Sequence, residues 1–180
     1  MSKNYVIGFP RIGEKRELKK VLEDYWAKKV DFSEVKYVAE NLRKRHWTYQ
    51  KEAKIDFIAS NDFSLYDNML DSSILIGAIP KRFQHLKDEE LYFAMARGNQ
   101  DCVAMEMTKW FNTNYHYIVP EISKDTTFKL NSKKVIEEYK EALELGINTK
   151  INLKKPLFMQ EKTEDKITGA EKIGRAHVWT

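Results

Sequence analysis

Hydrophobic and polar positions near the start of the chain follow two different periods. A short β-prone run at residues 5–7 precedes the turn residues Gly8, Pro10 and Gly13, which predicts a strand that ends in a tight turn. From Glu14 onward the apolar residues fall at helical spacing. They form one stripe that should be buried, made of Leu18, Leu22, Tyr25 and Trp26. The opening stretch therefore predicts strand, turn and helix.

The same two periods continue along the chain. Helices are predicted at residues 31–53, 64–76, 88–98 and 132–146, with Asp31, Asp88 and Ser132 as caps for three of them. β-prone runs lie at residues 55–59, twice between residues 102 and 120, and from residue 151. Strands that alternate with helices predict βαβ units and a mostly parallel sheet. The strands are too few for a closed eight-stranded barrel, so the sheet is either open or part of a longer barrel.

Two of the predicted helices have stripes that can be named residue by residue. In the helix at 31–53 the inward positions are Val35, Val38, Leu42, His46 and Tyr49. In the helix at 132–146 they are Val135, Ile136, Tyr139, Ala142 and Leu143. Both stripes follow the spacing of one helix face, so both helices should pack against the sheet.

Composition restricts the class of protein. The chain has 180 residues, of which 42% are hydrophobic and 32% are charged, and its net charge is +4. This charge permits an acidic ligand but is low for a nucleic-acid-binding protein. Cys102 is the only cysteine, which excludes an internal disulfide and favours a reducing compartment. Because we find neither a signal-like segment nor a membrane-spanning run, we expect a cytoplasmic protein with no membrane partner.

Cations crowd the start of the first predicted helix, where the helix dipole disfavours them. They are Lys15, Arg16, Lys19 and Lys20, and only Glu14 and Glu17 offset them. A helix N-terminus also presents N–H groups to anions. The cluster therefore has two interpretations, a receptor for a ligand with several negative charges or a solvated charged face.

Other candidate chemistry is sparse. The four histidines are scattered without zinc-ligand spacing, and no nucleophile elbow or phosphate-binding glycine loop is present. His46 lies on an apolar stripe and should be a core histidine, whereas His116 either enters a site or packs structurally. Acidic residues at expected strand ends are Asp62 and Glu106. Lys109, among aromatic neighbours, either belongs to a site at such an end or extends its ammonium into water.

Four motifs carry a resemblance to a known family. They are GFPRIGEKRELKK, RHWTYQKEAKIDFIASNDFSLYD, LYFAMARG and EMTKWFNTNYHYIVPE, at residues 8–20, 45–67, 91–98 and 106–121. Over residues 5–153 the chain resembles the N-terminal part of cobalamin-independent methionine synthase, also called 5-methyltetrahydropteroyltriglutamate–homocysteine methyltransferase. The resemblance implies a role in transferring the methyl group of the folate polyglutamate to homocysteine.

The resemblance also implies a fold and a division of roles. The fold would be a partial (βα)8 TIM-type barrel, roughly the first half of the family's N-terminal barrel, with its open edges covered by homodimerisation. Zinc and homocysteine would bind to a C-terminal barrel that this chain lacks, without cobalamin, so the chain alone would be inactive. Its expected partner is 5-methyltetrahydropteroyltri-L-glutamate, bound through Arg16, Glu17, Leu18, Lys19 and Lys109, with no catalytic residue and no metal ligand.

The tail differs from the rest of the chain. Residues 154–180 lack an apolar stripe, and the closing GRAHVWT belongs to no earlier pattern. We expect residues 1–153 to form the barrel domain and 154–180 to be a non-native or naturally disordered tail. Two other functions stay open, a non-catalytic module that binds polyanions or folate and, ranked last, a nucleic-acid-binding protein.

Overall fold

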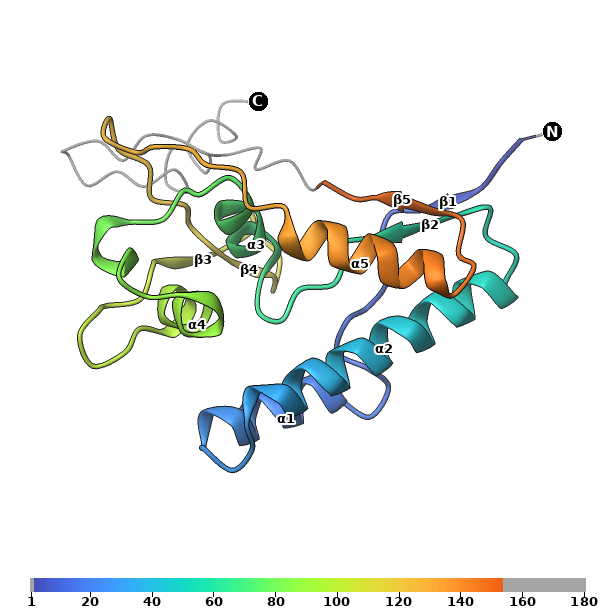
Figure 1. Cartoon of the computed structure of the whole chain (residues 1–180), viewed down its shortest axis with the longest axis horizontal. Helices are drawn as coiled ribbons and strands as arrows, with labels where there is room; N and C mark the ends of the chain where they lie inside the picture. Colours follow the sequence, from blue (N-terminus) through green and yellow to red (C-terminus); the bar gives the residue numbers. More distant parts are fainter. Residues whose placement is uncertain (1, 154–180) are drawn as a thin grey trace. The chain divides into compact units, whose positions relative to one another are not determined.

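The computed structural model describes residues 2–153 and shows an α/β protein (Figure 1). Its residues divide into two compact units. Unit 1 consists of residues 2–65 and 132–153, and unit 2 consists of residues 66–131. The prediction of a disordered or non-native tail at 154–180 lies outside the described residues. The prediction that residues 1–153 form one domain stays a prediction.

Unit 1 contains a three-stranded sheet in which every pairing is parallel. Its strands are β1 (Tyr5–Val6), β2 (Phe57–Ser60) and β5 (Thr149–Ile151), in the order β1-β2-β5. Helices α1 (Glu17–Trp26) and α2 (Phe32–Glu52) connect β1 to β2, and α5 (Lys133–Glu144) leads into β5. The predicted βαβ units are therefore confirmed for this unit, while the partial TIM-type barrel remains a proposal.

The helices of unit 1 bury the residues that pack on the sheet. Trp47, Ile58, Ala142 and Ile147 form one cluster, and the Trp47 Nε1–H donates to the Ala59 carbonyl at 3.0 Å. The predicted stripes are correct in part, since Leu18, Leu22, Val35, Leu42, His46, Val135 and Ala142 are buried. They are wrong for Tyr49, Ile136 and Leu143, which are exposed, because the helices turn slightly different faces inward than the spacing indicates.

Unit 2 has helices and a hairpin in place of a parallel sheet. It comprises α3 (Asn68–Leu75), the 3-10 helix η1 (Lys81–Phe83), α4 (Asp88–Arg97), β3 (Met107–Lys109) and β4 (His116–Ile118). The two extended runs expected between residues 102 and 120 are present. However, β3 and β4 pair with each other in an antiparallel sheet of their own, so the expected mostly parallel sheet describes only unit 1.

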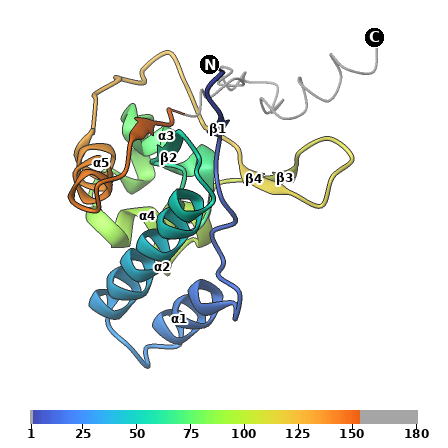
Figure 2. The same ribbon diagram turned by 90° about the vertical axis from the view of Figure 1, so that its right-hand side faces the viewer.

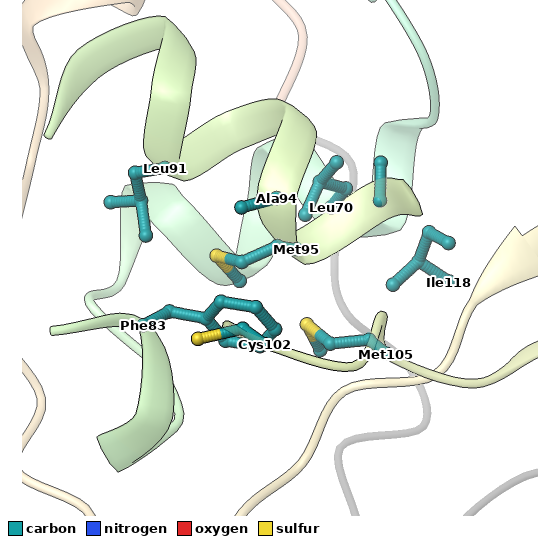
Figure 3. Close-up of a cluster of buried hydrophobic side chains, with 9 residues drawn as sticks. Leu70, Phe83, Leu91, Ala94, Met95, Cys102, Met105 and Ile118 are labelled. Carbon is teal, nitrogen blue, oxygen red and sulfur yellow. The ribbon is translucent and has the colours of Figure 1, made fainter. Parts of the chain in front are cut away.

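A sulfur-rich hydrophobic cluster forms the core of unit 2 (Figure 3). Phe83 and Met95 are fully buried, and Cys102 and Met105 lie beside them. The cluster joins η1, α4, α3 and β4, since it also includes Leu70 and Ile118. Flexible thioether side chains fill such irregular spaces between short elements.

The boundaries of three helices differ from the prediction for local reasons. Helix α1 begins at Glu17, later than expected, because Arg16 before it has the left-handed φ of 59°. Helix α3 begins at Asn68, because the Asp67 side chain accepts hydrogen bonds from the first turn. Asp88 is the first residue of α4 and not its cap, a position that Lys87 occupies.

Candidate functional site

The first predicted ligand-binding run, Arg16 to Lys19, starts helix α1 in unit 1. A turn precedes it, in which the Arg16 N–H donates to the Gly13 carbonyl at 3.0 Å. Gly13 has a φ of 84°, and an added Cβ would lie 2.3 Å from a Glu17 carboxylate oxygen, so this position requires glycine. No side chain caps the helix, and the Arg16 side chain is exposed beside the first turn.

The negative charge of Glu17 is balanced by an arginine that the sequence did not reveal. The Arg45 Nη2 of helix α2 lies 2.7 Å from Glu17 Oε1, and the Lys15 N–H donates to Oε2 at 2.9 Å. The pKa of Glu17 is lowered to about 2, and the hydrogen bond from Arg45 is the largest cause of this shift. The carboxylate therefore stays charged at neutral pH, but its charge is balanced within the protein.

The other two residues of the run, Leu18 and Lys19, differ in burial. Leu18 is 0% exposed and belongs to the core, so it holds the helix in place. Lys19 forms an ion pair with Glu23 at 3.5 Å, and both side chains are about half exposed, at 47% and 56%. An exposed pair of this kind is weak, so its lysine can rearrange to meet a ligand. Arg16 and Lys19 are thus the two members that can reach an anion directly.

Lys109, the second predicted element of the site, lies in unit 2 at the end of strand β3. It is exposed and stands opposite His116 in the antiparallel register. Figure 2 shows the hairpin that β3 and β4 form. His116 is also exposed, with its Nδ1 3.1 Å from the Asn114 carbonyl. Behind them, Trp110 packs against the cluster of Met69, Tyr117 and Val119. The hairpin thus presents a cation on a packed support.

Polar side chains meet where the parallel strands of unit 1 end. Asp62 Oδ2 accepts from the Phe9 N–H at 2.8 Å, and the Asn61 amide donates to the Asn152 carbonyl at 2.9 Å. Asn152 in turn donates to the Ile7 carbonyl at 2.6 Å. The prediction that Asp62 lies at a strand end is confirmed, and Asn61 lies beside it directly after β2. The same prediction is wrong for Glu106, which precedes β3.

His46 and Cys102 are engaged in packing. His46 is buried and stacks on Phe9 with ring centroids 4.7 Å apart, as expected for a core histidine, and burial lowers its pKa. Cys102 is buried, with its Sγ 2.9 Å from the Arg82 carbonyl. Among residues 2–153, no group of three or more His, Cys, Asp and Glu side chains could hold a metal ion. These residues therefore do not fit a zinc site.

No helix within the described residues combines the length and apolar character needed to cross a membrane. The fold and the exposed cations define an α/β protein with parallel βα units and positive side chains at a helix start and on a hairpin. A family model described as the N-terminal domain of cobalamin-independent synthase matches residues 3–167. The chain belongs to this family. The match extends past residue 153, into the segment that we set apart from the fold.

Curated relatives carry the name 5-methyltetrahydropteroyltriglutamate–homocysteine methyltransferase. The protein of Desulforamulus reducens is 66% identical over 154 residues, which cover 85% of this chain and 20% of the relative. That of Flavobacterium johnsoniae is 48% identical over 175 residues, covering 93% of this chain and 23% of the relative. The protein of Bifidobacterium longum subsp. infantis is 53% identical over 152 residues, covering 81% and 20%. The chain thus spans about a fifth of the length of these relatives.

Proposed function

We propose that this chain supplies the folate polyglutamate-binding part of a methyltransferase that forms methionine from homocysteine and 5-methyltetrahydropteroyltriglutamate. The name of the relatives supports this reaction. In this proposal the chain has the fold of a partial TIM-type barrel, works in the cytoplasm, and is inactive alone. Zinc and homocysteine would bind to a part of the relatives that this chain does not cover.

The observation that carries the proposal is the pairing of Glu17 with Arg45. A free carboxylate at the start of α1 would repel an acidic ligand, but here an internal cation balances it at 2.7 Å. Arg16, the N-cap residue, and Lys19, whose ion pair with Glu23 is exposed, are then the cations that meet the ligand. Arginine can bind a carboxylate through two parallel hydrogen bonds, and lysine acts as a point charge.

The three cations have distinct roles in this proposal. Arg16 and Lys19 bind carboxylates of the glutamate tail from unit 1, and Lys109 binds one from unit 2. Glu17 and Leu18 contribute by holding the helix start. Charge-assisted hydrogen bonds are worth roughly 1.5–3 kcal/mol each, so the removal of one cation should weaken binding by about tenfold or more.

The test compares 5-methyltetrahydropteroyl triglutamate with the monoglutamate by calorimetric titration of the chain. We expect the triglutamate to bind more tightly, and Arg16→Ala, Lys19→Ala or Lys109→Ala to reduce this preference. Lys140→Ala in unit 1 and Lys124→Ala in unit 2, both exposed, are matched controls that should leave affinity unchanged. Equal affinity for the two folates would contradict the proposal, and tight binding of inorganic polyphosphate would favour a general polyanion-binding module.

A further inference from the structure

A buried carboxylate lies at the start of helix α3 in unit 2. Asp67 is 4% exposed, and its Oδ2 accepts from the N–H groups of Met69 at 2.9 Å and Leu70 at 3.1 Å. These two hydrogen bonds are the ones that an N-cap side chain normally accepts from the first turn of its helix. A buried charge is costly unless its remaining lone pairs are also used, and here the further bonds come from outside the helix.

Both additional hydrogen bonds come from the β3–β4 hairpin. The Ile118 N–H of strand β4 donates to Asp67 Oδ2 at 3.1 Å. The Tyr115 hydroxyl donates to Asp67 Oδ1 at 2.6 Å, a short distance typical of a hydroxyl bound to a charged oxygen. One carboxylate therefore caps α3 and at the same time ties two points of the hairpin to it.

Tyr115 extends this attachment to the strand that carries Lys109. Its backbone carbonyl accepts from the Trp110 N–H at 2.7 Å, and Trp110 follows Lys109 directly in the sequence. Tyr115 is 45% exposed, and its hydroxyl bond to Asp67 connects it to the start of α3. Strands of three residues are too short to fix a hairpin by their own pairing, so this attachment adds to the packing of Trp110 in fixing the position of Lys109.

We propose that Asp67 and Tyr115 are positioning residues that hold the hairpin so that Lys109 meets a carboxylate of the ligand in a fixed place. This inference rests on the proposed function, in which Lys109 binds the glutamate tail. Asp67 and Tyr115 do not touch the ligand. They reduce the conformational freedom that Lys109 would otherwise lose on binding, which is the usual benefit of preorganisation.

The first measurement needs no ligand. Tyr115→Phe in the 180-residue chain removes one hydroxyl, and we expect amide hydrogen exchange at Trp110 to become about tenfold faster, since a bond to a charged acceptor is lost. Tyr37→Phe, at a tyrosine of α2 that is 62% exposed, is the control and should leave that rate unchanged. An unchanged rate at Trp110 in Tyr115→Phe overturns the positioning proposal, whatever the ligand data are.

The second measurement compares ligand affinity between variants. Tyr115→Phe should weaken triglutamate binding, as Lys109→Ala does, and should leave the affinity for the monoglutamate unchanged. Arg16→Ala should cause the same loss of triglutamate affinity with or without Tyr115→Phe. Asp67→Asn, which keeps an acceptor oxygen, should restore part of the affinity that Asp67→Ala loses. If exchange at Trp110 is faster but triglutamate affinity is unchanged, the positioning role is wrong.

The two proposals fail in different ways. If the wild-type chain binds both folates equally, the proposed function fails. The positioning role then stands only if two results are obtained. Tyr115→Phe and Lys109→Ala must weaken the binding of both folates equally, and Tyr115→Phe must also make amide exchange at Trp110 faster. If Lys109→Ala weakens triglutamate binding and Tyr115→Phe does not, the proposed function stands and the positioning role falls.

Discussion

Unit 1 and unit 2 each carry cations that we propose to bind the ligand, but each unit holds its cations by different means. In unit 1, Arg16 is the N-cap residue of α1 and Lys19 lies in the first turn, which the buried Leu18 holds against the core. In unit 2, Lys109 depends on Tyr115 and on Asp67, which is 48 residues away from Tyr115 in the sequence. A helical turn places neighbouring side chains through local geometry, whereas a short hairpin needs distant partners.

The interiors of the two units show the same difference. Unit 1 packs helices on a parallel sheet and joins α2 to α5 through the ion pairs of Arg43 with Glu138 and Glu141. Unit 2 packs short elements around Phe83 and Met95. Its ion pair between Arg82 and Glu121, with N–O distances of 2.6 and 2.7 Å, fastens the segment that follows β4. Stability should therefore respond separately in the two units.

The largest expected effect is the removal of the central ring of unit 2. Phe83→Ala should reduce the free energy of unfolding by about 3–5 kcal/mol, because the ring is fully buried and leaves a cavity. Chemical denaturation gives the loss, and hydrogen exchange shows where it acts. Amides of unit 2 should lose protection while Ile58 of unit 1 keeps it. Phe128→Ala, at an exposed ring, is the control, and equal loss in both units would remove the distinction between them.

A comparable effect in unit 1 should follow from Arg43. Its guanidinium lies 2.8 Å from Glu141 and 3.9 Å from Glu138, whose side chains are 15% and 6% exposed. Arg43→Ala should cost about 3 kcal/mol of unfolding free energy, since two poorly hydrated carboxylates lose a partner. Lys44→Ala is the control, because its pair with Glu40 is about half exposed and should contribute much less to stability. Thermal or chemical denaturation compares the two variants.

Acidification should partly reverse the Arg43→Ala loss. Burial already raises the pKa of Glu141 despite the opposing effect of Arg43, so the variant should raise it further. A carboxyl whose folded pKa lies above its unfolded value destabilises the fold at neutral pH, and this cost diminishes as pH falls through the folded pKa. The variant should thus recover stability relative to wild type between pH 7 and pH 5. A constant difference over that range would contradict this account of the α2–α5 ion pairs.

The smallest expected effect concerns the start of α1. Glu17→Gln should lower the unfolding free energy at pH 7 by about 0.2–1 kcal/mol, because the pair with Arg45 is partly exposed. The folded pKa is about 2 against a normal value of 4.5. The ion pair therefore stabilises the fold above pH 4.5, and its contribution disappears as pH falls toward 2. Denaturation of wild type and variant should differ at pH 7 and converge near pH 2. A difference independent of pH would mean that charge is not involved.

Much of unit 1 could be predicted from the sequence because its signals are local. The helical stripe from Leu18 to Leu22, the cap at Asp31 and the β-prone run at 55–59 each depend on neighbours a few residues away, and each gives an element close to the one observed. Unit 2 was harder to predict. The two extended runs were visible, but their antiparallel pairing was not. Asp67, which accepts hydrogen bonds from the hairpin, had no signal beyond a polar residue before an apolar run.

The candidate site shows the same limit. Arg16 to Lys19 and Lys109 were proposed from the resemblance and from the unusual charge at the helix start, but Arg45, Asp67 and Tyr115 were not. Each of these three acts across a long sequence separation, of 28 residues for Arg45 with Glu17 and 48 for Tyr115 with Asp67. A pattern read along the chain contains no information about which distant groups will meet.

The sequence by itself determined the α/β character, the alternation of helices and strands, the family, and the cations at the first helix. Tertiary structure alone decided that Glu17 is balanced by Arg45 and that a buried carboxylate ties the hairpin of Lys109 to α3. The physical reason is that helical and strand periods arise from local backbone geometry. Hydrogen bonds to a buried charge, in contrast, depend on which segments the folded chain brings together.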